Sequence, residues 1–216
     1  MDVLLRRNPR ARRLILRIGR DGPVLTVPAR LREREAQAFL EKNEAWLRER
    51  MSAAPASTLV AHGSTVMVAG QVLNVRPGKG RVEVSGDDLL VPGASERAGA
   101  HVAAFLKADA RLRLTRASET HARTLGRSFA KITLRDTKSR WGSCSTTGNL
   151  MYSWRLAMAP PEVLDYVAAH EVAHLVEFNH SRFFWRLVDD LCPDYPYHRA
   201  WLKESGPELH GYRFNA

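Results

Sequence analysis

Three histidines and two glutamates lie within the eleven residues HEVAHLVEFNH, residues 170–180. If this segment is helical, His170 and His174 lie one turn apart on one face, where two imidazoles can share a metal ion. Glu171 is then about 100° around the helix, so it can reach a water on that ion without being a ligand. The pattern is typical of a zinc hydrolase. The metal lowers the pKa of the water to about 7, and Glu171 is the general base that accepts its proton.

A catalytic zinc needs a third protein ligand and an open fourth position. Glu177 shares the face of His170 and His174, but in a continuous helix it lies about 10 Å along the axis from His170. His180 points away from that face unless the helix ends first. Asn179 tolerates the left-handed conformation that ends helices, and Ser181 can cap a new helix over 182–191. We therefore favour His180 as third ligand of one zinc per chain, with Glu177 as the partner of a ligand imidazole. The alternative is an unbroken helix in which Glu177 is the ligand.

The elements that must position this site can be read from residue patterns. Two proline residues before Glu162 predict that the site helix starts there and runs over 160–178. Apolar patterning indicates strands over 131–136 and 149–156, a helix over about 95–125 and another over 31–50. The N-terminal residues indicate an edge strand, and 12–18 and 24–29 indicate a hairpin. The predicted fold is α+β, with a β-rich N-terminal part over 1–93 and a catalytic domain over 94–216.

Residues 138–202 resemble the YgjP-like metallopeptidases, which are relatives of the SprT and WLM zinc peptidases. The resemblance is carried by RWGSC (140–144), YVAAHEVAHL (166–175) and NHSRFFW (179–185). It implies a zincin-like catalytic domain that hydrolyses peptide bonds, with His170, His174 and His180 as zinc ligands and Glu171 as base. Glu177 stands where a metzincin has its turn glycine, which implies a different turn. In zincin-like folds an edge strand beside the zinc pairs with extended substrate, and 149–156 is our candidate for that strand.

Several further residues are candidates for supporting roles. Tyr195, Tyr197, His198 and Arg199 follow the second predicted helix, and any of them could stabilise an oxyanion or simply pack at the surface. We expect Trp141 to serve packing rather than substrate contact. Cys144 could reach the zinc as an inhibitory thiolate, although a buried small residue is the favoured interpretation. Cys192 is interpreted as structural.

Composition limits the partners. The 216 residues include 44% hydrophobic and 26% charged residues, with a net charge of +10. The basic excess falls in 1–20 and 111–155, whereas 162–194 around the histidines is acidic. A basic surface of this kind predicts either ordinary solvated charge or a nucleic-acid partner. The second functional hypothesis is therefore a nucleic-acid-associated protein whose zinc site acts on bound proteins. The sequence has no apolar run approaching about 18 residues, so no membrane span is predicted. Two cysteines provide no disulfide framework, so we expect a cytoplasmic protein.

Overall fold

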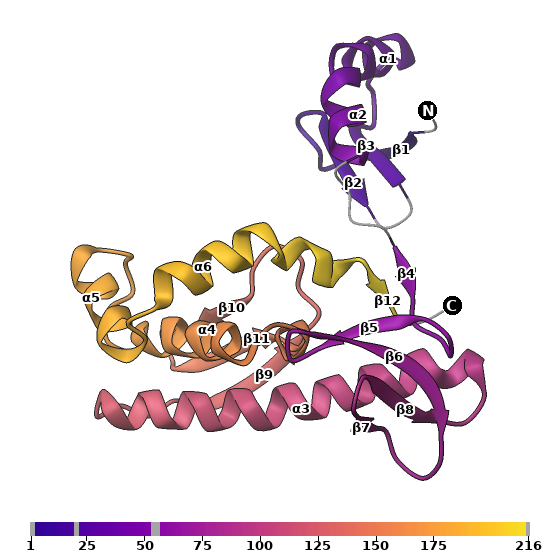
Figure 1. Cartoon of the computed structure of the whole chain (residues 1–216). Helices are drawn as coiled ribbons and strands as arrows, with labels where there is room; N and C mark the ends of the chain where they lie inside the picture. Colours follow the sequence, from indigo (N-terminus) through magenta and orange to yellow (C-terminus); the bar gives the residue numbers. More distant parts are fainter. Residues whose placement is uncertain (1–2, 20–21, 53–56, 215–216) are drawn as a thin grey trace. The chain divides into compact units, whose positions relative to one another are not determined.

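The computed structural model of the chain describes residues 3–19, 22–52 and 57–214. The chain forms two compact units, Met1–Ala54 and Pro55–Ala216, and its mixed helices and small sheets confirm the α+β class (Figure 1). The division falls after Ala54 rather than near Gly93. The reason is that Val66, Val75 and Leu89, which precede residue 93, belong to the same buried core as Val102 and Leu106, which follow it.

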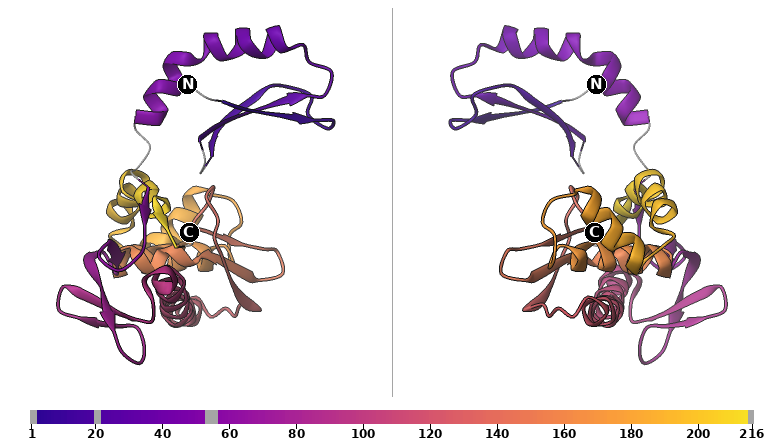
Figure 2. Two further views of the ribbon diagram at one scale, coloured as in Figure 1. Left: turned by 90° about the vertical axis from the view of Figure 1, so that its right-hand side faces the viewer. Right: turned by 90° about the vertical axis from the view of Figure 1, so that its left-hand side faces the viewer.

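The N-terminal unit is a three-stranded sheet with two helices. Its strands are β1 (Leu4–Asn8), β2 (Ile15–Gly19) and β3 (Gly22–Pro28), in the order β1-β3-β2. β2 pairs antiparallel with β3, which confirms the predicted hairpin, and β1 is an edge strand as expected. Alternation along β3 buries Leu25 and Val27 against α1 (Glu33–Lys42), whose Ala36 completes the small core. Figure 2 shows the helices on one face of this sheet.

The predicted helix over 31–50 is interrupted. α1 ends at Lys42, and α2 (Glu44–Ser52) follows after Asn43. The Asn43 side chain donates a hydrogen bond to the backbone oxygen of Phe39 at 2.8 Å, while its backbone N–H donates to Leu40. Asn43 therefore satisfies the last carbonyls of α1, which is how such residues end helices.

The second unit begins with short strands. These are β4 (Thr58–Leu59), β5 (Thr65–Val68), β6 (Gln71–Gly78), β7 (Glu83–Ser85) and β8 (Asp88–Pro92). The last four form a sheet in the order β5-β6-β8-β7, and β4 pairs in parallel with β12 (Tyr212–Arg213) near the C-terminus. The β4–β12 pair ties the C-terminal end of the chain to the start of this unit.

Helix α3 (Ser95–Thr124) matches the predicted 95–125 and runs along the second unit beside α4 (Pro161–Ala173) (Figure 1). Two polar contacts fix α3 to the elements of the site. His121 Nε2 lies 3.1 Å from an oxygen of Asp165 on α4, and the Ser118 hydroxyl is 2.9 Å from that of Tyr152. These contacts, with the shared core, hold α4 in a defined position and orientation.

The sheet nearest the site has the order β10-β11-β9, from β9 (Lys131–Arg135), β10 (Gly142–Cys144) and β11 (Asn149–Ser153). Our expectation that 149–156 is an edge strand is wrong. β11 lies between the other two strands, and residues Trp154–Met158 form a 3₁₀ helix, η1. The edge strands are β9 and β10, and β10 contacts α4. Sequence patterns do not encode strand order, because the order is decided by contacts between distant segments.

A buried arginine holds the segment around this sheet. Arg155, 2% exposed, donates to both carboxylate oxygens of Asp136 at 2.6 and 3.2 Å and to the backbone oxygen of Leu209 at 2.6 Å. A further bond at 3.2 Å reaches the Tyr212 oxygen. Because Asp136 directly follows β9, these bonds anchor the connector that leads to β10.

The remaining helices are α5 (Arg182–Leu191), α6 (Tyr195–Glu204) and the 3₁₀ helix η2 (Gly206–His210). Among the helices of the described residues, none combines the length and apolar character that crossing a membrane would require.

Candidate metal centre and active site

The helical conformation is interrupted between His174 and Ser181, and this break between α4 and α5 shapes the site. α4 ends at Ala173, earlier than the predicted break near 178–179, and His174 is its C-cap residue. The N–H groups of Val176 and Glu177 both bond to the Ala173 oxygen, at 3.0 and 3.1 Å, which turns the chain out of the helix. The chain is therefore free to return His180 towards α4, as the sequence argument required.

The second helix starts where the sequence predicted. The Ser181 hydroxyl accepts hydrogen bonds from the backbone N–H of Phe183 at 3.2 Å and of Phe184 at 3.4 Å. This N-cap satisfies two donors of the first turn of α5 and fixes the residue next to His180.

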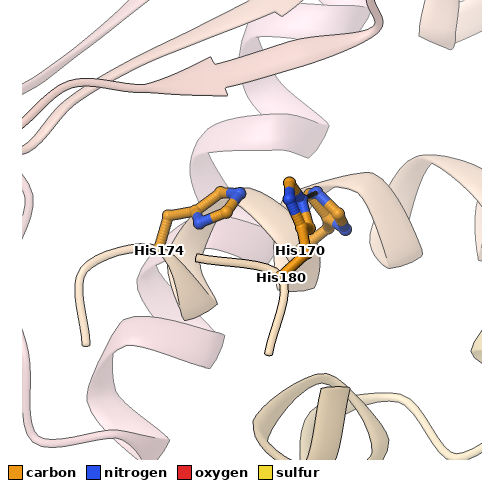
Figure 3. Close-up of side chains that lie close together, drawn as sticks. All are labelled: His170, His174 and His180. Atoms are coloured by element: carbon orange, nitrogen blue, oxygen red, sulfur yellow. Dashed lines mark hydrogen bonds between the residues drawn. The ribbon is translucent and has the colours of Figure 1, made fainter. Parts of the chain in front are cut away.

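The break brings three imidazoles together. The ligand nitrogens of His170, His174 and His180 all lie within 4.8 Å of one another, and no other such group of three occurs in the part of the chain that the structure describes. His170 Nε2 and His180 Nε2 are 3.1 Å apart (Figure 3). His174 Nδ1 donates to the Glu177 backbone oxygen at 3.0 Å, which leaves its Nε2 as a free lone pair.

Glu177 supports the site differently from our expectation. Its backbone oxygen, rather than its carboxylate, is the partner of the His174 imidazole. The carboxylate accepts a bond from the Asn179 N–H at 3.1 Å and so stabilises the loop. With the helix ended at Ala173, the unbroken-helix alternative with Glu177 as ligand is not the arrangement found.

Two aromatic side chains, Phe184 and Trp185, pack against the histidines. Phe184 is fully buried, and its ring centroid lies 4.9, 4.4 and 4.7 Å from those of His170, His174 and His180. Trp185 lies beside His170 and His180, at 5.7 and 5.8 Å. These contacts restrict the rotation of the imidazoles, which is how a packed shell orients metal ligands.

Burial controls the charge of the imidazoles. It lowers the pKa of His170 to about 3, with further lowering from His174, His180 and Arg199. The pKa of His174 is also lowered, mainly by burial, although the Glu177 carbonyl opposes this. Both side chains are therefore neutral near pH 7, the form in which an imidazole binds a metal.

Glu171 faces the edge strand β10. It is 5% exposed, and burial raises its pKa to about 8, while the charge of Arg140 acts in the opposite direction. Its Cγ and Cδ would lie 2.6 and 2.7 Å from a Cβ placed on Gly142 of β10. Glycine at position 142 therefore leaves the room that the Glu171 side chain occupies, so RWGSC (140–144) packs directly against the HEVAH segment (170–174).

Glu171 and the three histidines line an open cavity of about 490 Å³. Its other walls are Ser139, Arg140, Gly142, Ser143, Cys144 and Phe178. Cys144 donates its S–H to the Ser145 oxygen at 3.4 Å, and burial, followed by the charge of Glu171, raises the pKa of its thiol to about 11. Cys144 is therefore a thiol rather than a thiolate at neutral pH.

The register of β10 shows which backbone groups face this opening. The Ser153 N–H bonds to the Trp141 oxygen and the Ser145 N–H to the Asn149 oxygen, so odd-numbered residues of β10 pair with β11. In an antiparallel ladder the alternate residues then direct N–H and C=O away from the partner strand. Gly142 and Cys144 accordingly present their backbone groups at the free edge.

The four candidates after α5 separate into two groups. Arg199 lies over the Trp185 ring at 4.7 Å, and Tyr195 stacks on the same ring at 5.3 Å, so both contact a side chain that lies beside His170 and His180. His198 instead lines a separate cavity of about 580 Å³ with Cys192, and Tyr197 is largely exposed beside it. Trp141 packs against Gly206 and stacks on His210 at 5.0 Å, in keeping with a packing role.

Sequence reasoning missed four residues of the site: Arg140, Gly142, Tyr166 and Phe184. The helical spacing from Tyr166 to His170 and the position of Phe184 in the first turn of α5 were visible signals. Arg140 and Gly142 lie within RWGSC (140–144), but this segment by itself does not indicate that they meet Glu171, because that proximity depends on how β10 packs on α4.

Comparisons with known proteins identify a family for this chain. Residues 12–205 match the sequence profile described as YgjP-like, metallopeptidase domain. A search of curated proteins found no match. Among solved structures, the metallopeptidase zymogen abylysin of Pyrococcus abyssi is 22% identical with a TM-score of 0.37. The match covers 43% of this chain and 95% of that one.

Proposed function

The chain belongs to the YgjP-like metallopeptidase family, and from that premise we propose that it is a zinc-dependent peptidase. In this proposal His170, His174 and His180 hold one zinc ion, and Glu171 is the general base of a zincin-like catalytic domain. The observation that carries the proposal is the convergence of three imidazoles on an open cavity that the buried Glu171 side chain also lines.

The donor set fits zinc. Nitrogens bound at about 2.0–2.1 Å to a tetrahedral ion lie about 3.3 Å apart, and the His170 and His180 Nε2 atoms are 3.1 Å apart. The site offers three protein ligands and opens to a cavity, whereas structural zinc is typically four-coordinate and closed. A divalent cation at this point would also favour the charged form of Glu171.

The reaction can be written for the residues of the chain. Bound zinc would supply Lewis-acid polarisation and a lowered pKa for water. The Glu171 carboxylate accepts a proton from the attacking water as the new C–O bond forms at the substrate carbonyl carbon. Glu171 then returns that proton to the amide nitrogen as the C–N bond breaks. Arg199 and Tyr195, which both contact Trp185 next to the histidines, are the candidates for stabilising the negative charge that develops on the carbonyl oxygen.

The free edge of β10 supports an extended peptide as the substrate. The outward backbone groups of Gly142 and Cys144 can pair with a peptide strand, which is main-chain recognition that tolerates many sequences. A strand at this edge would pass Glu171, because that side chain packs directly on Gly142.

The test is metal analysis followed by peptide digestion. We expect about one zinc per chain and cleavage of unstructured peptides, loss of cleavage after chelation, and its return when zinc is restored. Cleavage that survives complete chelation would overturn the zinc assignment. A zinc-loaded protein that cleaves no peptide in a diverse mixture would overturn the peptidase assignment.

A second function is favoured by a separate observation in the N-terminal unit. Residues 1–32 carry nine arginines and no lysine against two aspartates. Cross-strand register places Arg6 beside Thr26 and Arg17 beside Val24, on the face opposite to buried Leu25 and Val27. Figure 2 shows the helices of this unit on one face of its sheet, and α1 packs on Leu25. By the strand register, Arg6 and Arg17 lie on the other face.

Three further exposed arginines, Arg10, Arg12 and Arg13, lie between β1 and β2. Among the described residues, none of these five arginines has a carboxylate within 4.0 Å. Arg7, by contrast, donates to the backbone oxygens of Ala29 and Leu31 at 2.9 Å and serves the fold. Unpaired guanidinium groups bind phosphates well. We therefore propose that this face docks the backbone of nucleic acid, so that the peptidase would act on proteins bound there.

Binding of labelled duplex DNA, single-stranded DNA and RNA at 50 and 200 mM salt tests this second proposal. Five phosphate contacts predict a loss of affinity of roughly several hundred-fold between these salts. Arg6→Glu with Arg17→Glu should abolish binding. The matched control, Arg34→Glu with Lys42→Glu on α1, changes the net charge equally and should weaken binding less. If the two pairs of substitutions weaken binding equally, the proposed docking face is contradicted, and binding reflects only the attraction of nucleic acid to the net positive charge of the protein.

A further inference from the structure

A second, smaller cavity adjoins the candidate active site. It measures about 210 Å³ and shares Arg140, Gly142, His170 and Glu171 with the larger one. The two cavities therefore lie at adjacent ends of the boundary between β10 and α4, and the residues they share include those of the proposed reaction centre.

The two ends differ in chemistry. The smaller cavity is completed by Trp141, Tyr166, Val167 and Leu202, of which the last three are buried. The larger end is instead lined by Ser139, Ser143, Cys144 and the histidines, with Phe178 as its aromatic wall. Apolar groups therefore gain by leaving water at the first end, whereas the second end suits polar or small groups.

The size of the smaller cavity limits what can enter. A closed cavity of roughly 150 Å³ is known to hold a benzene molecule, so about 210 Å³ accommodates one leucine, methionine or phenylalanine side chain.

Substrate geometry connects this cavity to the cleaved bond. A peptide paired with the free edge of β10 has side chains that alternate in direction, and its carbonyl at Glu171 is the one that reacts. A residue adjoining that bond then has its side chain at the smaller cavity, which begins at Glu171 and His170.

We infer that this cavity selects peptides with an apolar side chain, of leucine to phenylalanine size, on one fixed side of the cleaved bond. The inference rests on the proposed peptidase function and adds the substrate class. Leu202 and Val167 are specificity residues in this arrangement, since they line the cavity without contacting the reacting atoms.

The experiment maps cleavage sites in a peptide mixture by mass spectrometry and then compares two peptides that differ only in leucine or alanine at the selected position. Wild-type protein should cleave the leucine peptide with a kcat/KM at least about 10–200-fold higher than that of the alanine peptide. This range is the effect of a single methylene group in an apolar pocket. Leu202→Trp, which fills the cavity, should remove most of that ratio while the zinc content stays unchanged. Leu202→Ala should instead shift the preference towards larger side chains. This variant replaces Leu202→Trp as the test if the tryptophan variant does not fold.

The matched control is Leu191→Trp, because Leu191 lines the separate 580 Å³ cavity. It should keep the wild-type ratio. Cleavage sites with no apolar preference on either side, or equal ratios in wild type and a folded Leu202 variant, would overturn the inference while the peptidase function stands. If zinc-loaded wild type cleaves neither peptide nor the mixture, the proposed function fails and the inference fails with it.

Discussion

The Glu171 side chain occupies the space that any side chain at Gly142 would need. A Cβ on Gly142 would lie 2.6 Å from Cγ and 2.7 Å from Cδ of Glu171, well inside contact distance. The edge strand and the helix that carries the proposed base are therefore packed in direct contact at this point, and the position of Glu171 depends on the absence of one methyl group.

We predict that Gly142→Ala displaces Glu171 and lowers peptide hydrolysis while the zinc remains bound. The loss should approach the roughly 10²–10⁴-fold contribution of a positioned base. Zinc should stay bound because the three atoms nearest to a Cβ at position 142 all belong to Glu171 and none to a histidine. Steady-state kinetics and zinc content measured on the same samples check this. Thr146→Ala, at an exposed position in the turn after β10, is the control. Full activity in the Gly142 variant would show that Glu171 needs no fixed position.

Glu171→Gln tests the base itself. The amide keeps nearly the same shape but cannot accept a proton from water, so hydrolysis should fall by about 10²–10⁴-fold. Zinc content should be unchanged, because Glu171 is not among the converging ligand atoms. Equal rates in variant and parent at equal zinc content would exclude Glu171 as base.

The ligand assignment predicts different losses of zinc affinity for two neighbouring residues. His180→Ala should lose most of the affinity, since it removes one of three ligands. Glu177→Ala should lose at most about 10-fold, the lower end of the effect of residues that orient ligands, because the backbone oxygen that holds His174 remains. Competition with a chelator of known affinity measures both. The opposite ranking would mean that Glu177, not His180, completes the site.

The raised pKa of Glu171 predicts a gain in stability for the metal-free Glu171→Gln variant. Burial raises this pKa from 4.5 to about 8. Below pH 4.5 the carboxyl is protonated in both folded and unfolded chains, so its burial does not lower the stability of the folded state through ionisation. As pH rises from 4.5 to 8 the unfolded chain loses the proton first, and the folded state loses stability relative to it.

The melting temperature of the chelated variant should therefore exceed that of the chelated parent by an amount that grows between pH 5 and pH 8. Glu162→Gln, at an exposed position in the first turn of α4, is the control and should show no such trend. A difference that stays constant with pH would contradict the linkage.

The sequence alone determined the local features of this site. The spacing of His170, Glu171 and His174, the two prolines that start α4, and Ser181 as the cap of α5 all act within one or two helical turns. Residue types therefore suffice to predict them. The need for a break before His180 followed from helix geometry in the same way. Only the point of the break differed, because the bonds of Val176 and Glu177 to Ala173 turn the chain sooner.

The tertiary structure decided what depends on distant segments. That β10 rather than β11 is an edge strand, that Arg140 and Gly142 meet Glu171, and that Phe184 lies under three imidazoles all result from packing between separate elements. The boundary after Ala54 likewise reflects a core that the strands of 58–92 share with α3. Periodicity reveals which face of an element is buried, but the neighbour that covers that face is chosen by the whole fold.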